Sequence, residues 1–344
     1  MQPARGAGRS LHSLEPRARR RQRGRMLSPR LAACWLGCSL LGGALPAAPS
    51  PATATLPAGV QRVLFLGDSI TYGGFYTVCV EAYFTTRAPA RRLEFMNLGL
   101  SSETVSGLSE EGHAGGAFPR PDLHERLGRV LAQTKPDLVF ACYGMNDGIY
   151  LPFDDARFAA FQAGMRRLRS AVLATGAKLV HATPAIYVDV KGTSPGYAAV
   201  LDRYSAWLVA QRADGWEVAD LHTAMAREFA ARRKTDPAFT FARDGVHPDE
   251  AGHWVMARAL LVHLGARDLP DGQGVNEMLA AHPEGPALFK LIRTRSELMR
   301  DAWLTATGHI RPKVKAGLPM TEARKRSDEI TAEIQTLLRA TPKR

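Results

Sequence analysis

Five short apolar runs recur between residues 62 and 222, and stretches with helical spacing separate them. Near-continuous hydrophobicity in runs of this length indicates strands that are buried on both faces, as in a parallel sheet with helices on each side. Residues 155–174 and 197–213 have the apolar spacing of such helices. The pattern predicts an α/β domain over residues 58–265, a three-layer α/β/α sandwich around a five-stranded parallel sheet. The runs are RVLFLG (62–67), LEFMNLG (93–99), DLVFACYG (137–144), KLVHATP (178–184) and WEVADLH (216–222).

Beyond residue 265 these runs cease, and two charged segments with helical spacing follow, residues 283–308 and 321–340. A loop-like segment, residues 309–319, separates them. We predict that residues 266–344 form a helical C-terminal extension that packs on the α/β domain. Residues 311–344 carry nine basic and four acidic side chains. This modest excess is typical of a solvated helix, and a basic surface for a polyanion is the alternative interpretation.

The first 54 residues differ in composition from the rest of the chain. Nine arginines and one acidic residue, Glu15, fall within residues 1–30, so this segment carries +8 of the formal net charge of +12. An apolar segment too short to span a bilayer comes next and small residues follow it, which is the order of a secretory signal. We therefore expect residues 1–54 to be a basic n-region and signal peptide, cleaved between Ala47 and Ala54, and the protein to be periplasmic or secreted.

The signal leaves two details open. Translation starts either at Met1 or at Met26, because the latter gives a signal of more ordinary length. A lipoprotein-like box, LAAC, ends at Cys34, but it precedes the apolar segment instead of following it, which argues against lipidation. After removal of the signal we expect no stable membrane insertion. Since most of the positive charge belongs to the signal, we expect no nucleic-acid partner.

The mature chain keeps two cysteines, Cys79 and Cys142, and both stand in apolar surroundings. Buried free thiols and a single disulfide both agree with this pattern in an oxidising compartment. Neither cysteine belongs to a metal-binding motif.

The candidate chemistry lies where the predicted strands end, since ligands of open parallel sheets bind at the carboxyl ends of the strands. Ser69 follows the first run directly, within the stretch GDSI. A serine at a strand-to-helix turn presents its hydroxyl where the helix N-terminus and free backbone N–H groups can stabilise an oxyanion. The alternative interpretation is an ordinary helix N-cap, because Asp and Ser are both preferred there.

The stretch DGVH provides the partners that a reactive serine needs. A serine hydroxyl becomes nucleophilic when a base accepts its proton, and an imidazole base needs a carboxylate to fix its tautomer. Asp244 and His247 are three residues apart, which allows both side chains to lie on one turn. Taken alone, a loop histidine beside Pro248 has a structural role as its alternative.

Acyl transfer also needs donors that face the developing oxyanion. We expect three: the backbone N–H groups of Ser69 and Gly99 and the side-chain amide of Asn146. Gly99 suits a close backbone approach because it has no side chain. Each of the last two residues is alternatively a plain turn residue.

Four blocks of the chain together resemble the SGNH, or GDSL-type, esterase and lipase superfamily. The resemblance covers residues 63–253 and implies the flavodoxin-like SGNH hydrolase fold. One departure lies in the second block, where Ser102 stands at a position that is often a further glycine in the family. The blocks are FLGDSITYG (65–73), NLGLSSETVSG (97–107), YGMNDG (143–148) and DGVHPDEAGH (244–253).

The resemblance assigns a role to each candidate residue. It implies Ser69 as nucleophile and first oxyanion donor, with Gly99 and Asn146 as the other donors. It implies that Asp244 and His247 complete a catalytic triad. Two further acids would support the site: Asp68 as a structural or orienting acid and Asp147 as a loop-holding acid.

The implied function is a serine esterase that hydrolyses carboxylic esters through a covalent acyl-enzyme, without a metal or organic cofactor. Two long polar loops, residues 109–126 and 187–197, favour short-chain or carbohydrate O-acetyl esters as substrates. Phe118, Tyr187 and Tyr197 in these loops are candidates to stack on a sugar ring. The alternatives are a lysophospholipase or thioesterase of the same family and a non-catalytic carbohydrate-binding protein of the cell envelope.

Overall fold

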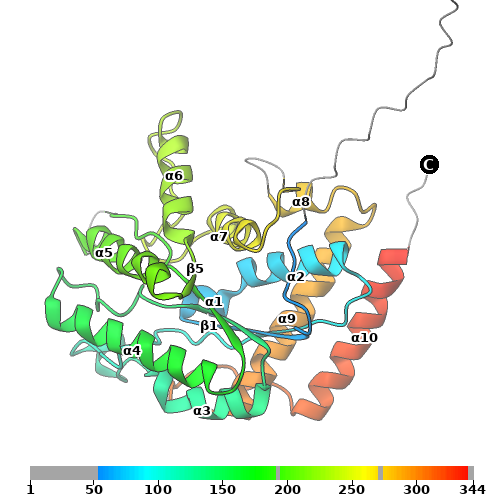
Figure 1. The fold of residues 1–344 in the computed structure, drawn as a ribbon, viewed down its shortest axis with the longest axis horizontal. Coiled ribbons are helices and arrows are strands. Elements are labelled where there is room, and N and C mark those ends of the chain that lie inside the picture. The colour runs from blue at the N-terminus through cyan, green and yellow to red at the C-terminus, as the bar shows by residue number, and fades with distance from the viewer. Residues whose placement is uncertain (1–52, 191–193, 270–273, 340–344) are drawn as a thin grey trace, which may run out of the picture. The chain divides into compact units, whose positions relative to one another are not determined.

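Five parallel strands form a sheet in the order β2-β1-β3-β4-β5 (Figure 1). The structure is a computed structural model and describes residues 53–190, 194–269 and 274–339. Each strand lies inside one of the five apolar runs, so the predicted sheet is confirmed. The first strand spans its whole run, whereas the other four strands are shorter than their runs, because the last residues of these runs leave the sheet to form loops. The strands are β1 (Arg62–Gly67), β2 (Glu94–Asn97), β3 (Leu138–Cys142), β4 (Lys178–Ala182) and β5 (Glu217–Ala219).

Helices cover both faces of this sheet and complete the predicted three-layer sandwich (Figure 1). Helix α2 packs against α7 on one face, and α3 packs against α4 on the other. The α-helices are α1 (Ser69–Gly73), α2 (Phe75–Arg87), α3 (Leu123–Thr134), α4 (Asp155–Leu173), α5 (Tyr197–Ala210), α6 (Leu221–Arg233), α7 (Glu250–His263), α8 (Val275–Met278), α9 (Gly285–Thr307) and α10 (Met320–Arg339). Two short 3-10 helices are η1 (His113–Gly116) and η2 (Gln211–Asp214).

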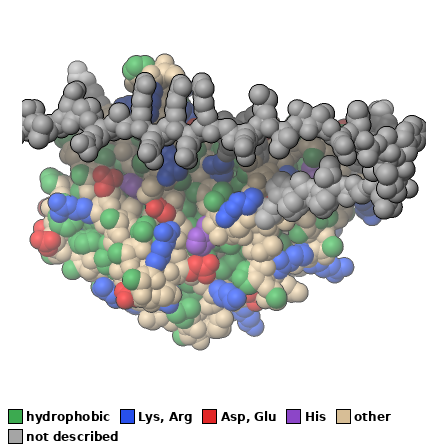
Figure 2. Space-filling view, turned by 45° about the horizontal axis from the view of Figure 1, so that its top comes forward, with side chains coloured by type: hydrophobic (Ala, Val, Ile, Leu, Met, Phe, Trp, Pro, Cys, Tyr) green, Lys and Arg blue, Asp and Glu red, His purple; other side chains and the backbone are tan. Residues whose placement is uncertain are grey.

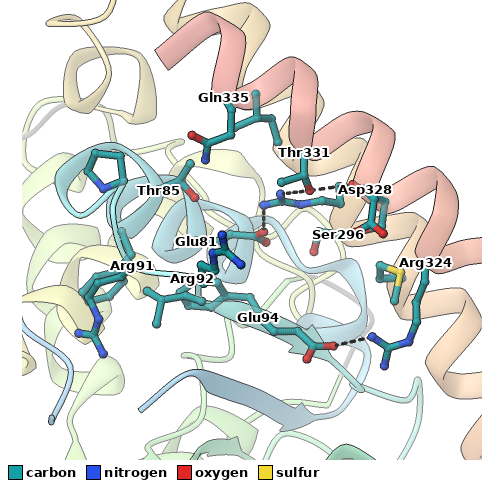
Figure 3. A pocket seen from close by; sticks show the side chains of 18 of the residues that line it. Glu81, Thr85, Arg91, Arg92, Glu94, Ser296, Arg324, Asp328, Thr331 and Gln335 are labelled. Atoms are coloured by element: carbon teal, nitrogen blue, oxygen red, sulfur yellow. Dashed lines mark hydrogen bonds and ion pairs between the residues drawn. The ribbon is translucent and has the colours of Figure 1, made fainter. Parts of the chain in front are cut away.

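The residues of the predicted extension form α8, α9 and α10. Helix α9 lies against α2 and against β2, the edge strand of the sheet, and α10 lies along α9 (Figure 1). A cavity of about 700 Å³ remains between α2, β2 and these two helices (Figure 3). The extension therefore covers one end of the sheet, where β2 would otherwise have no neighbour on its outer side.

An ion pair joins the extension to α2. The Arg295 guanidinium donates to Glu81 Oε1 at 2.6 Å and to Thr331 Oγ1 of α10 at 2.7 Å (Figure 3). Only 5% of the Glu81 side chain and 15% of the Arg295 side chain are exposed. Burial raises the pKa of Glu81, and Arg295 opposes this rise. Each charge therefore stabilises the other in place of the hydration that both lose on burial.

Outside the site, three observations bear on the expectations from the sequence. Cys79 and Cys142 are both buried and free. No helix within the described ranges combines the length and the apolarity that a bilayer crossing requires. Figure 2 shows acidic and basic side chains interspersed among the described residues of the face in view. The predicted signal, residues 1–54, lies outside the described residues except for its last two.

Replacement of Arg295 tests the attachment of the extension. We expect Arg295→Ala to lower the free energy of unfolding by about 3–5 kcal/mol, because Glu81 would stay buried without a counter-charge. The matched control is Arg326→Ala, since Arg326 pairs with Glu322 on the exposed side of α10 and such pairs contribute about 1 kcal/mol or less. Urea denaturation measures both variants, and equally small losses would contradict the expectation.

Candidate active site

The turn between β1 and α1 leaves the hydroxyl of Ser69 available. Asp68 caps α1, because its Oδ1 accepts the backbone N–H of Ile70 at 2.9 Å. Ser69 is therefore not the cap, and its side chain is partly exposed at the end of the sheet. Gly67 permits this tight turn, since a Cβ atom there would lie 2.1 Å from Thr71 Oγ1.

Asp244 and His247 lie in the loop between α6 and α7. Asp244 Oδ1 accepts the backbone N–H groups of Val246 and His247 at 2.9 and 2.8 Å, and Asp244 Oδ2 lies 2.6 Å from His247 Nδ1. Partial burial raises the pKa of Asp244, but these hydrogen bonds outweigh it and hold the pKa below its usual range. The carboxylate therefore stays ionised beside the ring.

The ring of His247 connects this loop to the turn after β1. His247 Nε2 lies 2.8 Å from Ser69 Oγ. The structure thus brings together Ser69, His247 and Asp244 in one chain of hydrogen bonds, although Ser69 and His247 are 178 positions apart in the sequence. About half of each side chain of the Asp244–His247 pair is exposed, so solvent reaches the ring.

Gly99 differs from its expected role. Its backbone N–H donates to Asn97 Oδ1 at 2.9 Å, so this donor is already engaged within its own turn. The absence of a side chain serves close packing instead, because a Cβ atom would lie 2.3 Å from the backbone nitrogen of Tyr72. The expectation that this N–H faces an oxyanion therefore does not agree with the geometry.

Ser102 is a candidate donor that sequence reasoning missed. It has a φ of +68°, in the left-handed region that favours glycine. Within the described residues its backbone N–H has no hydrogen-bond partner. It directly precedes Glu103, whose carbonyl accepts from Asn146 Nδ2 at 3.2 Å. The signal was present in the sequence: this is the position where the family often has glycine, and a φ above zero explains that preference.

Two buried acids lie beside the turn and the loops. Burial raises the pKa of Asp68 to about 7 and that of Asp147 to about 6. Asp147 Oδ1 accepts the backbone N–H groups of Val105 and Ser106 at 2.9 and 2.8 Å. Asp147 thus fixes the loop that follows Ser102, and Asp68 fixes the start of α1.

Two of the three aromatic residues expected at the rim lie inside the protein. Tyr197 is 1% exposed and donates from its hydroxyl to the Met145 carbonyl at 2.8 Å. Tyr187 is 4% exposed, and its hydroxyl accepts the backbone N–H of Ser194 at 3.0 Å. Their expected stacking on a sugar is therefore wrong. Phe118 is partly exposed, between the ring of His113 and the guanidinium of Arg311.

Among the described residues, no group of three or more His, Cys, Asp or Glu side chains is arranged to hold a metal ion.

Comparison with known proteins places these residues in a wider context. The model of the GDSL-like Lipase/Acylhydrolase family matches residues 65–255. An acetylxylan esterase from Geobacillus stearothermophilus is 27% identical over 226 residues, which are 60% of this chain and 94% of that protein. A catalytic mutant of an acetylxylan esterase from the same organism covers 61% of this chain and 97% of its own, with 22% identity and a TM-score of 0.46.

A solved structure of a gut microbial diltiazem-metabolizing enzyme resembles more of the chain. It has a TM-score of 0.52 and 15% identity, and the match covers 84% of this chain and 88% of that one. At this identity the likeness concerns the fold.

The buried carboxyl group of Asp68 predicts a pH dependence of stability. Between about pH 4 and pH 7 the folded protein keeps a proton on Asp68 that the unfolded chain releases. Since the folded state binds more protons in this interval, the free energy of unfolding falls as pH rises and stays lower above pH 7. Asp68→Asn keeps a capping side chain but cannot ionise.

We expect the stability of Asp68→Asn, relative to wild type, to rise by about 4 kcal/mol between pH 4 and pH 8, because a shift of about three pKa units corresponds to that free energy. Urea denaturation at both values measures this difference. A difference that does not change with pH would contradict the burial of an ionisable Asp68.

Proposed function

The chain belongs to the GDSL-like lipase/acylhydrolase family and hydrolyses carboxylic esters, and on this premise we propose that it is a serine esterase that removes short acyl groups, acetyl first, from carbohydrates. The observation that carries the proposal is the hydrogen-bond chain from Asp244 through His247 to Ser69, with distances of 2.6 and 2.8 Å. A nucleophile, a base and an orienting acid in this order suit acyl transfer.

In the proposed mechanism Ser69 Oγ attacks the ester carbonyl while His247 Nε2 accepts its proton. The tetrahedral intermediate collapses, and the same ring donates the proton to the leaving alcohol oxygen. A water molecule then attacks the acyl-enzyme, again with His247 as base, and the carboxylic acid leaves as Ser69 regains its proton. Asp244 stays ionised throughout and stabilises the imidazolium.

Three donors would stabilise the oxyanion in this proposal. They are the backbone N–H groups of Ser69 and Ser102 and Nδ2 of Asn146. Ser102 replaces Gly99 because the Gly99 N–H already donates to Asn97, whereas that of Ser102 has no partner within the described residues. Loss of one such donor costs about 10²–10³ in kcat in a well-studied protease, so Asn146→Ala should be strongly impaired.

The proposed substrate class is supported by the acetylxylan esterase that resembles this chain and by the polar character of residues 109–126. The second candidate function, a lysophospholipase or thioesterase, uses the same triad on a longer acyl chain or a sulfur leaving group. A non-catalytic carbohydrate-binding role would not require the hydrogen-bond chain from Asp244 through His247 to Ser69.

Hydrolysis of p-nitrophenyl acetate, butyrate and laurate tests the proposal. We expect acetate to be the fastest of the three and Ser69→Ala to lower kcat by roughly 10⁴- to 10⁶-fold, as for other serine nucleophiles. Ser170→Ala, on the exposed side of α4, is the matched control and should keep full activity. Release of acetate from acetylated xylo-oligosaccharides then tests the carbohydrate substrate.

Two results would overturn parts of this proposal. Much faster hydrolysis of laurate than of acetate would favour the lipase-like alternative. Equally slow hydrolysis by wild type and Ser69→Ala would exclude the Ser69 mechanism and favour a binding role.

We also propose that the protein is exported, on the basis of the charge and apolar pattern of residues 1–54. Fusion of these residues to alkaline phosphatase, which is active only after export, should give an active reporter. Replacement of the arginines between residues 17 and 30 by glutamine should reduce export, because the positive n-region orients the signal. An inactive fusion that carries residues 1–54 would contradict this proposal.

A further inference from the structure

Tyr150 lies four positions beyond Asn146 in the loop after β3. Its hydroxyl donates to Asn146 Oδ1 at 3.1 Å, and Asn146 Nδ2 donates to the Glu103 carbonyl at 3.2 Å. Asn146 is 3% exposed, so its side chain is buried. It is thus held at both ends in one of two orientations that differ by a half-turn about the Cβ–Cγ bond.

The orientation decides whether Asn146 helps or opposes catalysis. The amide nitrogen carries two hydrogens, and one of them is engaged by the Glu103 carbonyl. The second is available for an oxyanion only while Nδ2, and not Oδ1, faces it. A reversed amide would present an oxygen to a developing negative charge. A donor fixed in advance also avoids reorganisation during the reaction.

The backbone that carries Tyr150 is strained. Ile149 and Tyr150 have φ values of +47° and +57°, two consecutive left-handed residues of which neither is glycine. Such conformations cost on the order of 1–3 kcal/mol each and persist where the surroundings impose them, often at functional sites. This left-handed turn brings the phenol of Tyr150 within hydrogen-bond distance of Asn146, four positions earlier.

Neighbouring side chains hold the ring of Tyr150. The ring of Tyr197 stacks on it, with centroids 4.8 Å apart, and the guanidinium of Arg120 lies over it at 5.2 Å. Arg120 is itself fixed by two hydrogen bonds to Glu110, at 2.6 and 2.7 Å. The phenol therefore has little freedom to leave Asn146.

We propose that Tyr150 is a positioning residue, which holds the Asn146 carboxamide with an Nδ2 hydrogen directed at the oxyanion. The inference rests on the proposed role of Asn146 as an oxyanion donor. Tyr150 acts through Asn146 and does not touch the reacting atoms.

Tyr150→Phe tests this role, because it removes the hydroxyl and keeps the stacked ring. We expect kcat for p-nitrophenyl acetate to fall about 10-fold with KM unchanged, since the lost interaction matters in the transition state. Loss of the amide donor itself is expected to cost more, about 10²–10³. The matched control is Tyr187→Phe, a tyrosine of the same cluster whose hydroxyl contacts Ser194 instead, and its kcat should stay within about two-fold of wild type.

A double-mutant cycle separates positioning from a general structural role. In the Asn146→Ala background, Tyr150→Phe should cause no further loss of kcat, because no amide remains to be oriented. Arg120→Gln, which loosens the ring without removing the hydroxyl, should give a smaller loss that also disappears in this background. It keeps the test usable if Tyr150→Phe does not fold.

The possible outcomes distinguish failure of this inference from failure of the proposed oxyanion role of Asn146. Full activity of Asn146→Ala would overturn the oxyanion role of Asn146 and the inference with it. An impaired Asn146→Ala combined with a Tyr150→Phe indistinguishable from Tyr187→Phe would overturn the inference alone. Equal losses of kcat from Tyr150→Phe in the wild-type and Asn146→Ala backgrounds would also overturn the inference alone.

Discussion

Parallel pairing of β1 with both β2 and β3 is the constraint on which the site depends. In this register Phe65 lies opposite Asn97 and Gly67 lies opposite Cys142, so the three strands end at one edge of the sheet. The loops that follow them carry Ser69, Ser102 and Asn146. A shift by one residue would also turn each side chain of a strand to the other face of the sheet, where it would meet different helices, so the apolar core and the site fix the same register. The core thereby positions groups that are distant in sequence.

These loops have no regular secondary structure, and buried polar contacts fix their conformation instead. Glu103 and Arg126 are almost completely buried and form two hydrogen bonds, at 2.6 and 2.8 Å, and Tyr143 donates to the same carboxylate at 2.7 Å. Arg126 also donates to the Leu98 carbonyl at 2.7 Å. Burial raises the pKa of Glu103, and the interactions with Arg126 and Tyr143 oppose this rise. Desolvated charges are costly, and this cost is offset only while the whole set of partners is in place.

The parts of the site that were predictable are those that local sequence determines. Apolar runs gave the strands, helical spacing gave α9 and α10, and the spacing within DGVH placed Asp244 beside His247. The remaining features depend on tertiary contacts. Ser102 adopts a glycine-like conformation that its own side chain does not favour, and Tyr187 and Tyr197 are buried although their segment has the composition of an exposed loop. The sequence carried no signal for Tyr150, because its proposed role depends on the left-handed turn at residues 149 and 150.

The burial of Glu81 beneath α9 shows that the folded unit extends beyond the end of the family match. The match to the family ends at residue 255, whereas the counter-charge of Glu81 and the helix beside β2 come from residues beyond 284. A chain cut at the end of the match would lose this counter-charge, expose the apolar side chains that pack against α9 and present the bare edge of a strand, which is a template for aggregation. The folded unit is therefore larger than the part that matches the family model, and helices that carry none of the proposed reacting groups complete it.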